Sequence, residues 1–274
     1  MDTIELGFWQ LAAAYVFVLI LLIIFRFKKI EREKELLISV IRMTLQLILV
    51  GYILTFIFEA QRMVYAILAL FIMLTFAIYN IFQRVQKPLS LRLKQIIALS
   101  MITGTLLSIF YFILVVVQVA PWYEPRYFIP LAGMMIGNSM TGITLGVERL
   151  VEGMKTQRQQ IEAALMLGAT PQMASDPVIK HAFNSAILPT INSMVGMGIV
   201  FLPGMMTGQI LAGASPLTAV QYQIAIMLGI SGCVALTVIL FVQLGYKTFF
   251  NQRHQLLRQD KPKNESQVKA NKTT

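Results

Sequence analysis

The sequence is poor in the residues that build reactive or metal-binding sites. It has one cysteine, Cys233, and two histidines, His181 and His254, among 274 residues. A single cysteine excludes an internal disulfide, and two distant histidines do not give the Cys/His spacing of a zinc site. Charged residues make up only 13%, and the chain has no phosphate-binding loop of the GxxxxGKS or GxxxxGKT type. The composition therefore argues against redox chemistry, a zinc site and ATP binding through that loop.

Apolar residues, by contrast, are abundant. They account for 57% of the chain, and the mean hydropathy is +0.69, which lies outside the usual range of soluble domains. The net charge of +10 comes from Lys and Arg in short clusters between apolar runs. Such clusters indicate membrane orientation rather than nucleic-acid binding. We therefore predict an all-α, multi-pass protein of the cell membrane without a nucleic-acid partner.

Seven stretches are long enough to cross a bilayer, whose core of roughly 30 Å needs about 20 apolar residues in a helix. The expected spans are residues 8–27, 38–58, 63–82, 96–120, 127–147, 189–213 and 220–246. The successive connections carry 0, 5, 1, 4, 1, 4, 0 and 7 Lys or Arg residues, with Arg26 counted in the second of them. Since positive connections stay in the cytoplasm, we expect the N-terminus outside and the C-terminus inside.

The chain divides into a transmembrane domain at 1–246 and a basic tail at 247–274. The tail is polar, and we expect it to be a disordered cytoplasmic extension. Arg42 lies within the second span, where its long side chain can reach the membrane interface; a role in substrate binding is the alternative. No Asp or Glu lies in the middle of a span, which argues against proton-driven secondary transport.

One connection, 148–188, is far longer than the others and has the composition of folded structure. Good helix formers with an apolar stripe run from Thr156 to Leu167, and Thr170-Pro171 is typical of the start of a second helix. Pro177 disfavours helix at the residue before it, so we expect the second helix to break there. A short amphipathic helix lying on the membrane surface is the alternative interpretation of this loop.

The sequence IEAALMLGA at 161–169 resembles the EAA loop of ABC-transporter permeases. In those permeases the loop forms a coupling helix that docks in a cleft of the ATP-binding subunit. The small Ala side chains permit close approach of another helix, the Glu carboxylate can form a charged contact, and Gly allows the chain to turn. The later Ile187-Leu188-Pro189 departs from the spacing usual in importers. The expected ATPase-coupling residues are Arg158, Glu162, Ala163, Ala164 and Gly168.

Three further segments, LPTINSM at 188–194, LPGMMTGQILAGASPL at 202–217 and QYQIAIM at 221–227, extend the resemblance. With them the chain is identified as a member of the FetB family, the membrane subunits of a bacterial iron-export ABC transporter related to plant aluminium-tolerance proteins. The resemblance covers nearly all of the chain outside the basic tail.

The resemblance implies a transport permease and not an enzyme. Two copies would assemble with two separate ATP-binding subunits, which would hold ATP and Mg, and no cofactor would bind this chain. The cargo would be iron or another metal. An ATP-independent channel or secondary carrier is the alternative, and a non-transport membrane scaffold is a third possibility.

A short motif occurs twice, as PLAGMMIGN at 130–138 and FLPGMMTGQ at 201–209. On two continuous spans the methionines would share a level roughly 12 Å from the outer ends. The predicted substrate-pathway residues are Met134, Met135, Asn138, Met205, Met206 and Gln209. The alternative is that the glycines are packing seams and that Met fills gaps beside them. Thioethers favour soft metals whereas ferrous iron prefers imidazole or carboxylate, so the identity of the metal stays open.

Overall fold

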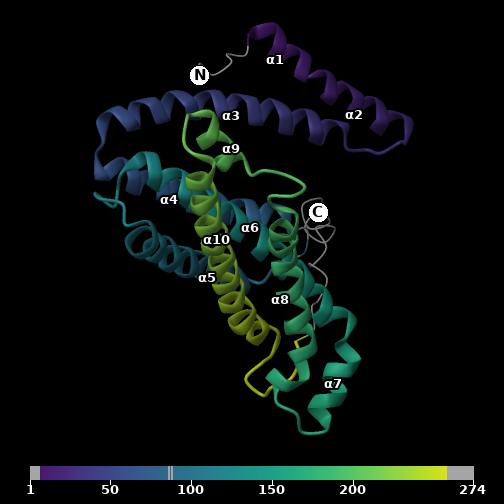
Figure 1. Cartoon of the computed structure of the whole chain (residues 1–274). Coiled ribbons are helices and arrows are strands. Elements are labelled where there is room, and N and C mark those ends of the chain that lie inside the picture. Colours follow the sequence, from purple (N-terminus) through teal and green to yellow (C-terminus); the bar gives the residue numbers. More distant parts are fainter. Residues whose placement is uncertain (1–6, 86, 88, 258–274) are drawn as a thin grey trace, which may run out of the picture.

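The computed structural model describes residues 7–85, 87 and 89–257, and in this part of the chain it is all-helical apart from two isolated β-bridges. Figure 1 shows the arrangement of the helices. Their bounds are α1 Phe8–Ala14, α2 Val16–Phe27, α3 Glu33–Ala60, α4 Met63–Arg84, α5 Leu91–Tyr111, α6 Pro125–Thr156, α7 Arg158–Met166, α8 Pro171–Gly196, α9 Gly204–Leu211 and α10 Pro216–Gly245. A π-helical turn, Phe112–Val117, extends α5, and a 3-10 turn, Tyr246–Phe249, extends α10.

Six segments of the described chain are long and apolar enough to cross a membrane. They are Phe8–Phe27, Glu33–Ala60, Met63–Arg84, Leu91–Val117, Pro125–Thr156 and Pro216–Phe249. These segments confirm the predicted all-helical, multi-pass architecture. The orientation of the chain in the membrane stays a prediction.

The span expected at 189–213 is wrong as a continuous helix. α8 ends at Gly196, and α9 begins only at Gly204 and is 8 residues long. Between them Gly198 takes a φ of +83°, and Met197 forms an isolated bridge with Phe201. The left-handed conformation of Gly198 is incompatible with a continuous helix, and Pro203, five residues later, has no backbone N–H to donate. Regular helical hydrogen bonding is therefore interrupted, although the segment is highly apolar.

The expected break at Pro177 is also wrong, because α8 runs without interruption through Pro177 and Pro189. The Thr170 hydroxyl caps the start of α8 by accepting a hydrogen bond of 3.3 Å from the backbone N–H of Met173. One face of α8 is buried against its neighbours, through Ser175, Val178, Ile179, Ala182, Ala186 and Thr190. This packing outweighs the hydrogen bond lost at each internal proline.

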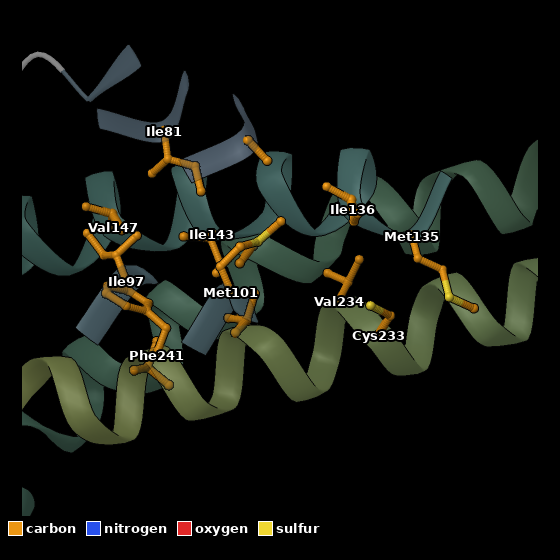
Figure 2. Close-up of a cluster of buried hydrophobic side chains, with 14 of the residues drawn as sticks. Ile81, Ile97, Met101, Met135, Ile136, Ile143, Val147, Cys233, Val234 and Phe241 are labelled. Carbon is orange, nitrogen blue, oxygen red and sulfur yellow. The ribbon is translucent and has the colours of Figure 1, made fainter. Parts of the chain in front are cut away.

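The core lies between α4, α5, α6, α8 and α10. Figure 2 shows its centre, where Ile97, Met101, Ile143 and Phe241 are fully buried. Close approach of the helices depends on glycines such as Gly142, where an added Cβ would lie 2.8 Å from a methyl group of Val234. Small residues at such positions are typical of helix contacts in membranes.

The helices α1, α2 and α3 form an arm along the top of Figure 1. Only Ile57 of these three helices is buried. Tyr15 joins the first two helices to α3 by a hydrogen bond of 2.6 Å to Thr44. The large apolar surface of this arm therefore fits a lipid environment rather than water.

The polypeptide continues in an ordered course after α10. Phe249 and Phe250 are buried, and Phe250 pairs with Leu256 in an isolated antiparallel bridge. The folded part therefore extends into the tail that we expected from residue 247. The remainder of that tail, residues 258–274, lies outside the described residues.

Candidate functional site

The long connection between the fifth and sixth expected spans consists of the end of α6, the whole of α7 and the start of α8. α6 has 32 residues, or about 48 Å at 1.5 Å per residue, which exceeds a hydrocarbon core of roughly 30 Å. α6 is therefore long enough to carry α7 beyond the bilayer. Figure 1 shows α7 at the opposite end of the molecule from α9.

All five residues expected to couple to an ATPase lie on α7 or directly after it. The Arg158 guanidinium binds Glu162 Oε1 at 2.7 Å and 2.8 Å through two of its nitrogens. It also donates a hydrogen bond of 3.5 Å to the carbonyl of Leu256. Gly168 has a φ of +91°, so it makes the turn that leads from α7 to α8. Ala163 is exposed and Ala164 half-buried.

Three apolar side chains at this turn, which no sequence pattern indicated, are exposed. Met166 is 82% exposed, Leu167 89% and Met173 69%. We call Met166, Leu167 and Met173 the apolar tip. Behind it, Ile161 is only 1% exposed and fixes α7 to the rest of the fold. Clustered apolar side chains in water are typical of a protein interaction site.

The four predicted methionines lie on two helices, α6 and α9. Met135 is 2% exposed and points toward α10 (Figure 2), where its Cε would lie 2.8 Å from a Cβ added at Gly229. α9, which carries Met205 and Met206, packs mainly against α10. The expected common depth rested on a continuous helix at 189–213, which the structure lacks.

The two predicted amides have different environments. Asn138 is exposed, and its Nδ2 donates a hydrogen bond of 2.8 Å to the carbonyl of Met134. Gln209 Oε1 is buried and has no hydrogen-bond partner in the part of the chain that the structure describes. The side-chain oxygen of Asn138 therefore lies at the surface of the protein, whereas that of Gln209 lies in the interior.

Two other methionines join α8 to α10 through polar contacts. Met194 Sδ accepts from Ser231 Oγ at 3.9 Å, and Met197 Sδ accepts from Gln223 Nε2 at 3.7 Å. The partners are far apart in the sequence, so no local pattern signals these pairs. Among the described residues no group of three or more His, Cys, Asp or Glu side chains could hold a metal ion. Metal ligands from this region would therefore be thioethers, amides, hydroxyls or carbonyls.

A cavity of about 820 Å³ opens between α5 and α10. Its walls are mainly apolar, with Leu107, Phe112 and Leu228 among the lining residues and Ser108 as one of few polar groups. Such a lining suits an apolar chain better than a hydrated ion.

Residues 8–250 match the protein family described as "Uncharacterised protein family (UPF0014)". The chain is 38% identical over 250 residues to Protein ALUMINUM SENSITIVE 3 of Arabidopsis thaliana, which covers 91% of this chain and 90% of that protein. It is 34% identical to UPF0014 membrane protein YjkA of Bacillus subtilis, over 93% of this chain and 100% of the relative.

Probable iron export permease protein FetB of Escherichia coli is 33% identical, over 90% of this chain and 94% of its own length. No solved structure matches the chain. The family match extends from α1 to the 3-10 turn after α10. The chain therefore belongs to the UPF0014 family of membrane proteins.

Proposed function

We propose that this chain is the membrane subunit of an ABC transporter that exports a metal with energy from a separate ATP-binding subunit. The observation that carries the proposal is the apolar tip, Met166, Leu167 and Met173, at the end of the loop that contains the EAA-like sequence. A permease that hydrolyses no ATP itself needs such a contact surface beyond the bilayer. The printed name of the Escherichia coli relative, an iron export permease, supports a metal as the cargo.

The tip has the form of a rigid docking element. α7 has 9 residues, or about 13 Å of helix, and Ile161 anchors its inner face. The ion pair between Arg158 and Glu162 lies on the same helix, so a partner would meet apolar side chains beside a paired charge. This combination of an apolar centre and a polar border is typical of specific protein interfaces.

The proposed assembly has two copies of this chain and two ATP-binding subunits. ATP and Mg bind to the partner subunits, and the permease supplies the membrane path. Docking of the partner at α7 would act on α6, which ends one residue before α7, and on α8, which the turn at 167–170 joins to α7.

The test is a triple substitution of the tip, Met166→Ser, Leu167→Ser and Met173→Ser, in the full-length permease produced with its ATP-binding subunit. The variant loses three apolar contacts that docking would bury. We expect co-purification of the ATPase and ATP-driven metal transport to fall at least tenfold, since about 1.4 kcal/mol of binding free energy gives that factor. The matched control is Gln159→Ser with Gln160→Ser, two exposed polar residues on the same helix.

Unchanged co-purification and transport in the triple variant would remove α7 as the docking element. Equal metal flux through vesicles that contain the wild-type permease alone, without ATPase, would identify a channel or carrier instead.

A further inference from the structure

The two least apolar of the long helices, α6 and α8, pack against each other. The most apolar window of α6 has a mean hydropathy of 1.3, whereas the other five candidate spans reach 2.0 to 2.6. α8 has 26 residues but is not among the candidate spans. It nevertheless lies beside two of them, because an added Cβ at Gly142 of α6 would be 3.4 Å from the carbonyl of Ala186 and Met194 reaches Ser231 of α10.

Polar residues recur on one face of each of these helices. On α6, Asn138 and Thr141 are exposed, and their spacing of three places them on the same face. On α8, Ser185 is half-buried and Asn192 is exposed, and a spacing of seven again places them on one face. We call Asn138, Thr141, Ser185 and Asn192 the polar track.

Both halves of the track point away from α10. On α6, Ser139 faces α10 through a contact of 3.2 Å between its Oγ and Cys233 Sγ, and Asn138 lies about 100° back around the helix. On α8, Met194 faces α10 through Ser231, and Asn192 lies about 200° back. Since α10 fills one side of the groove between α6 and α8, the track lines the other side.

The register of the two helices brings the track residues to nearby levels. Added Cβ atoms at Gly142 and Gly153 would meet Ala186 and Val178 respectively, so α6 and α8 run antiparallel. Continuing that register places Asn138 opposite residues 189–190, within about three residues, or roughly 4.5 Å, of Asn192. Toward α7 the same register brings Glu148 near the level of His181.

The track presents acceptor oxygens. Asn138 uses its Nδ2 in a hydrogen bond within α6, which leaves its Oδ1 free to accept. The Thr141 hydroxyl donates a hydrogen bond of 3.2 Å to the carbonyl of Gly137, so the lone pairs of its oxygen remain free to accept. Pro189 has no N–H to donate, so the carbonyl of Ser185, four residues earlier, lacks its helical partner. Oxygen ligands without a fixed charge bind cations weakly enough to release them.

We propose that the polar track lines the cargo path and that a second copy of this chain closes it, which gives a water-filled path for a partly hydrated, oxygen-preferring metal cation. The inference rests on the proposed transport function for the identity of the cargo. Unpaired amide oxygens are costly in lipid, so a face that carries two of them is expected to meet water or protein. A two-fold axis along the groove would duplicate every ligand and would bring two copies each of Asn138 and Asn192 to nearby levels.

The first experiment measures ATP-driven uptake of Fe²⁺, under anaerobic conditions, and of Ag⁺ into vesicles that contain the complete complex. Asn138→Leu combined with Asn192→Leu is expected to lower Fe²⁺ uptake at least tenfold without loss of the ATPase subunit. Gln221→Leu is the matched control, because Gln221 is an exposed amide of α10 outside the track. Fe²⁺ uptake at the wild-type rate by the double variant, or a transporter that moves Ag⁺ in preference to Fe²⁺, would overturn the assignment of the path or of its cargo class.

The second experiment needs no transport. The native Cys233 is fully buried, so single cysteines can be introduced over a low background. Asn138→Cys and Asn192→Cys are expected to react with a membrane-impermeant thiol reagent and to form cross-links between two copies of the chain. Leu228→Cys, an exposed apolar position of α10, is expected to do neither.

Absence of labelling and cross-linking at both track positions would overturn the inference. Labelling and cross-linking in a protein that transports neither metal would confirm the track and the second copy, and would show that the proposed cargo is wrong.

Discussion

The close contact between α5 and α10 makes Gly104 a sharp test of the fold. A Cβ at this position would lie 2.8 Å from both the Cα and the Oγ1 of Thr237, whereas non-bonded carbon atoms prefer about 3.5 to 4.0 Å. Side-chain rotation cannot relieve a clash with a backbone atom. The hydroxyl of Thr237 is also fully buried and bonded to the carbonyl of Cys233. Gly104→Ala therefore forces the two helices apart.

The magnitude follows from a comparison with Gly232→Ala, since no atom lies within 4 Å of a Cβ added at Gly232. Alanine favours both helices over glycine by about 1 kcal/mol, and this term cancels between the two variants. What remains is the overpacking cost at Gly104, about 1 to 3 kcal/mol. With about 2 to 4 °C per kcal/mol for a chain of this size, the thermal midpoint of Gly104→Ala is expected to lie about 2 to 12 °C below that of Gly232→Ala.

The assay is thermal unfolding of both purified full-length variants in the same detergent, followed by circular dichroism at one scan rate. A common scan rate is needed because membrane proteins often unfold irreversibly. Equal midpoints would refute the close approach of α5 and α10.

Two further predictions concern topology and the repeated motif. A reporter fused after Lys272 should be active in the cytoplasm and one in the 120–126 loop should be active outside; activity of the C-terminal fusion only on the outer side would show that the predicted orientation is wrong. Met134, Met135, Met205 and Met206 can be replaced together by Leu at a cost in folding stability below about 1.5 kcal/mol. We expect uptake into vesicles to stay close to wild type. A large loss of uptake would support a place for these methionines in the substrate pathway.

The spans were predictable where a long apolar run coincides with one helix. The stretch expected at 63–82 corresponds to α4, Met63–Arg84. α6 was expected to end at 147 but continues to Thr156, because helix-forming residues persist after the hydropathy falls. Hydropathy also failed at 189–213, since it records apolar character and not the positive φ of Gly198.

The functional residues divide in a similar way. The candidate coupling helix, α7, was predictable as a helix followed by a turn, because Gly168 and the residues before it form a local pattern. The side on which Asn192 lies was not readable from the sequence, because it depends on the register of α8 against α6. The same limit applies to the methionine repeat. Neighbouring residues such as Met134 and Met135 point about 100° apart on a helix, so which of them faces a common site depends on how the helices pack.

The hydrogen bond between Arg158 and the carbonyl of Leu256 has a mechanical consequence. The segment after α10 folds back on itself, and the N–H of Leu257 donates to the carbonyl of Phe249 at 2.8 Å. α7 is thus covalently continuous with α6, joined to α8 by a short turn, and tied to the end of α10. A force applied to α7 is distributed over three membrane helices at once, so the expected response is a concerted shear of the bundle rather than the tilt of a single helix.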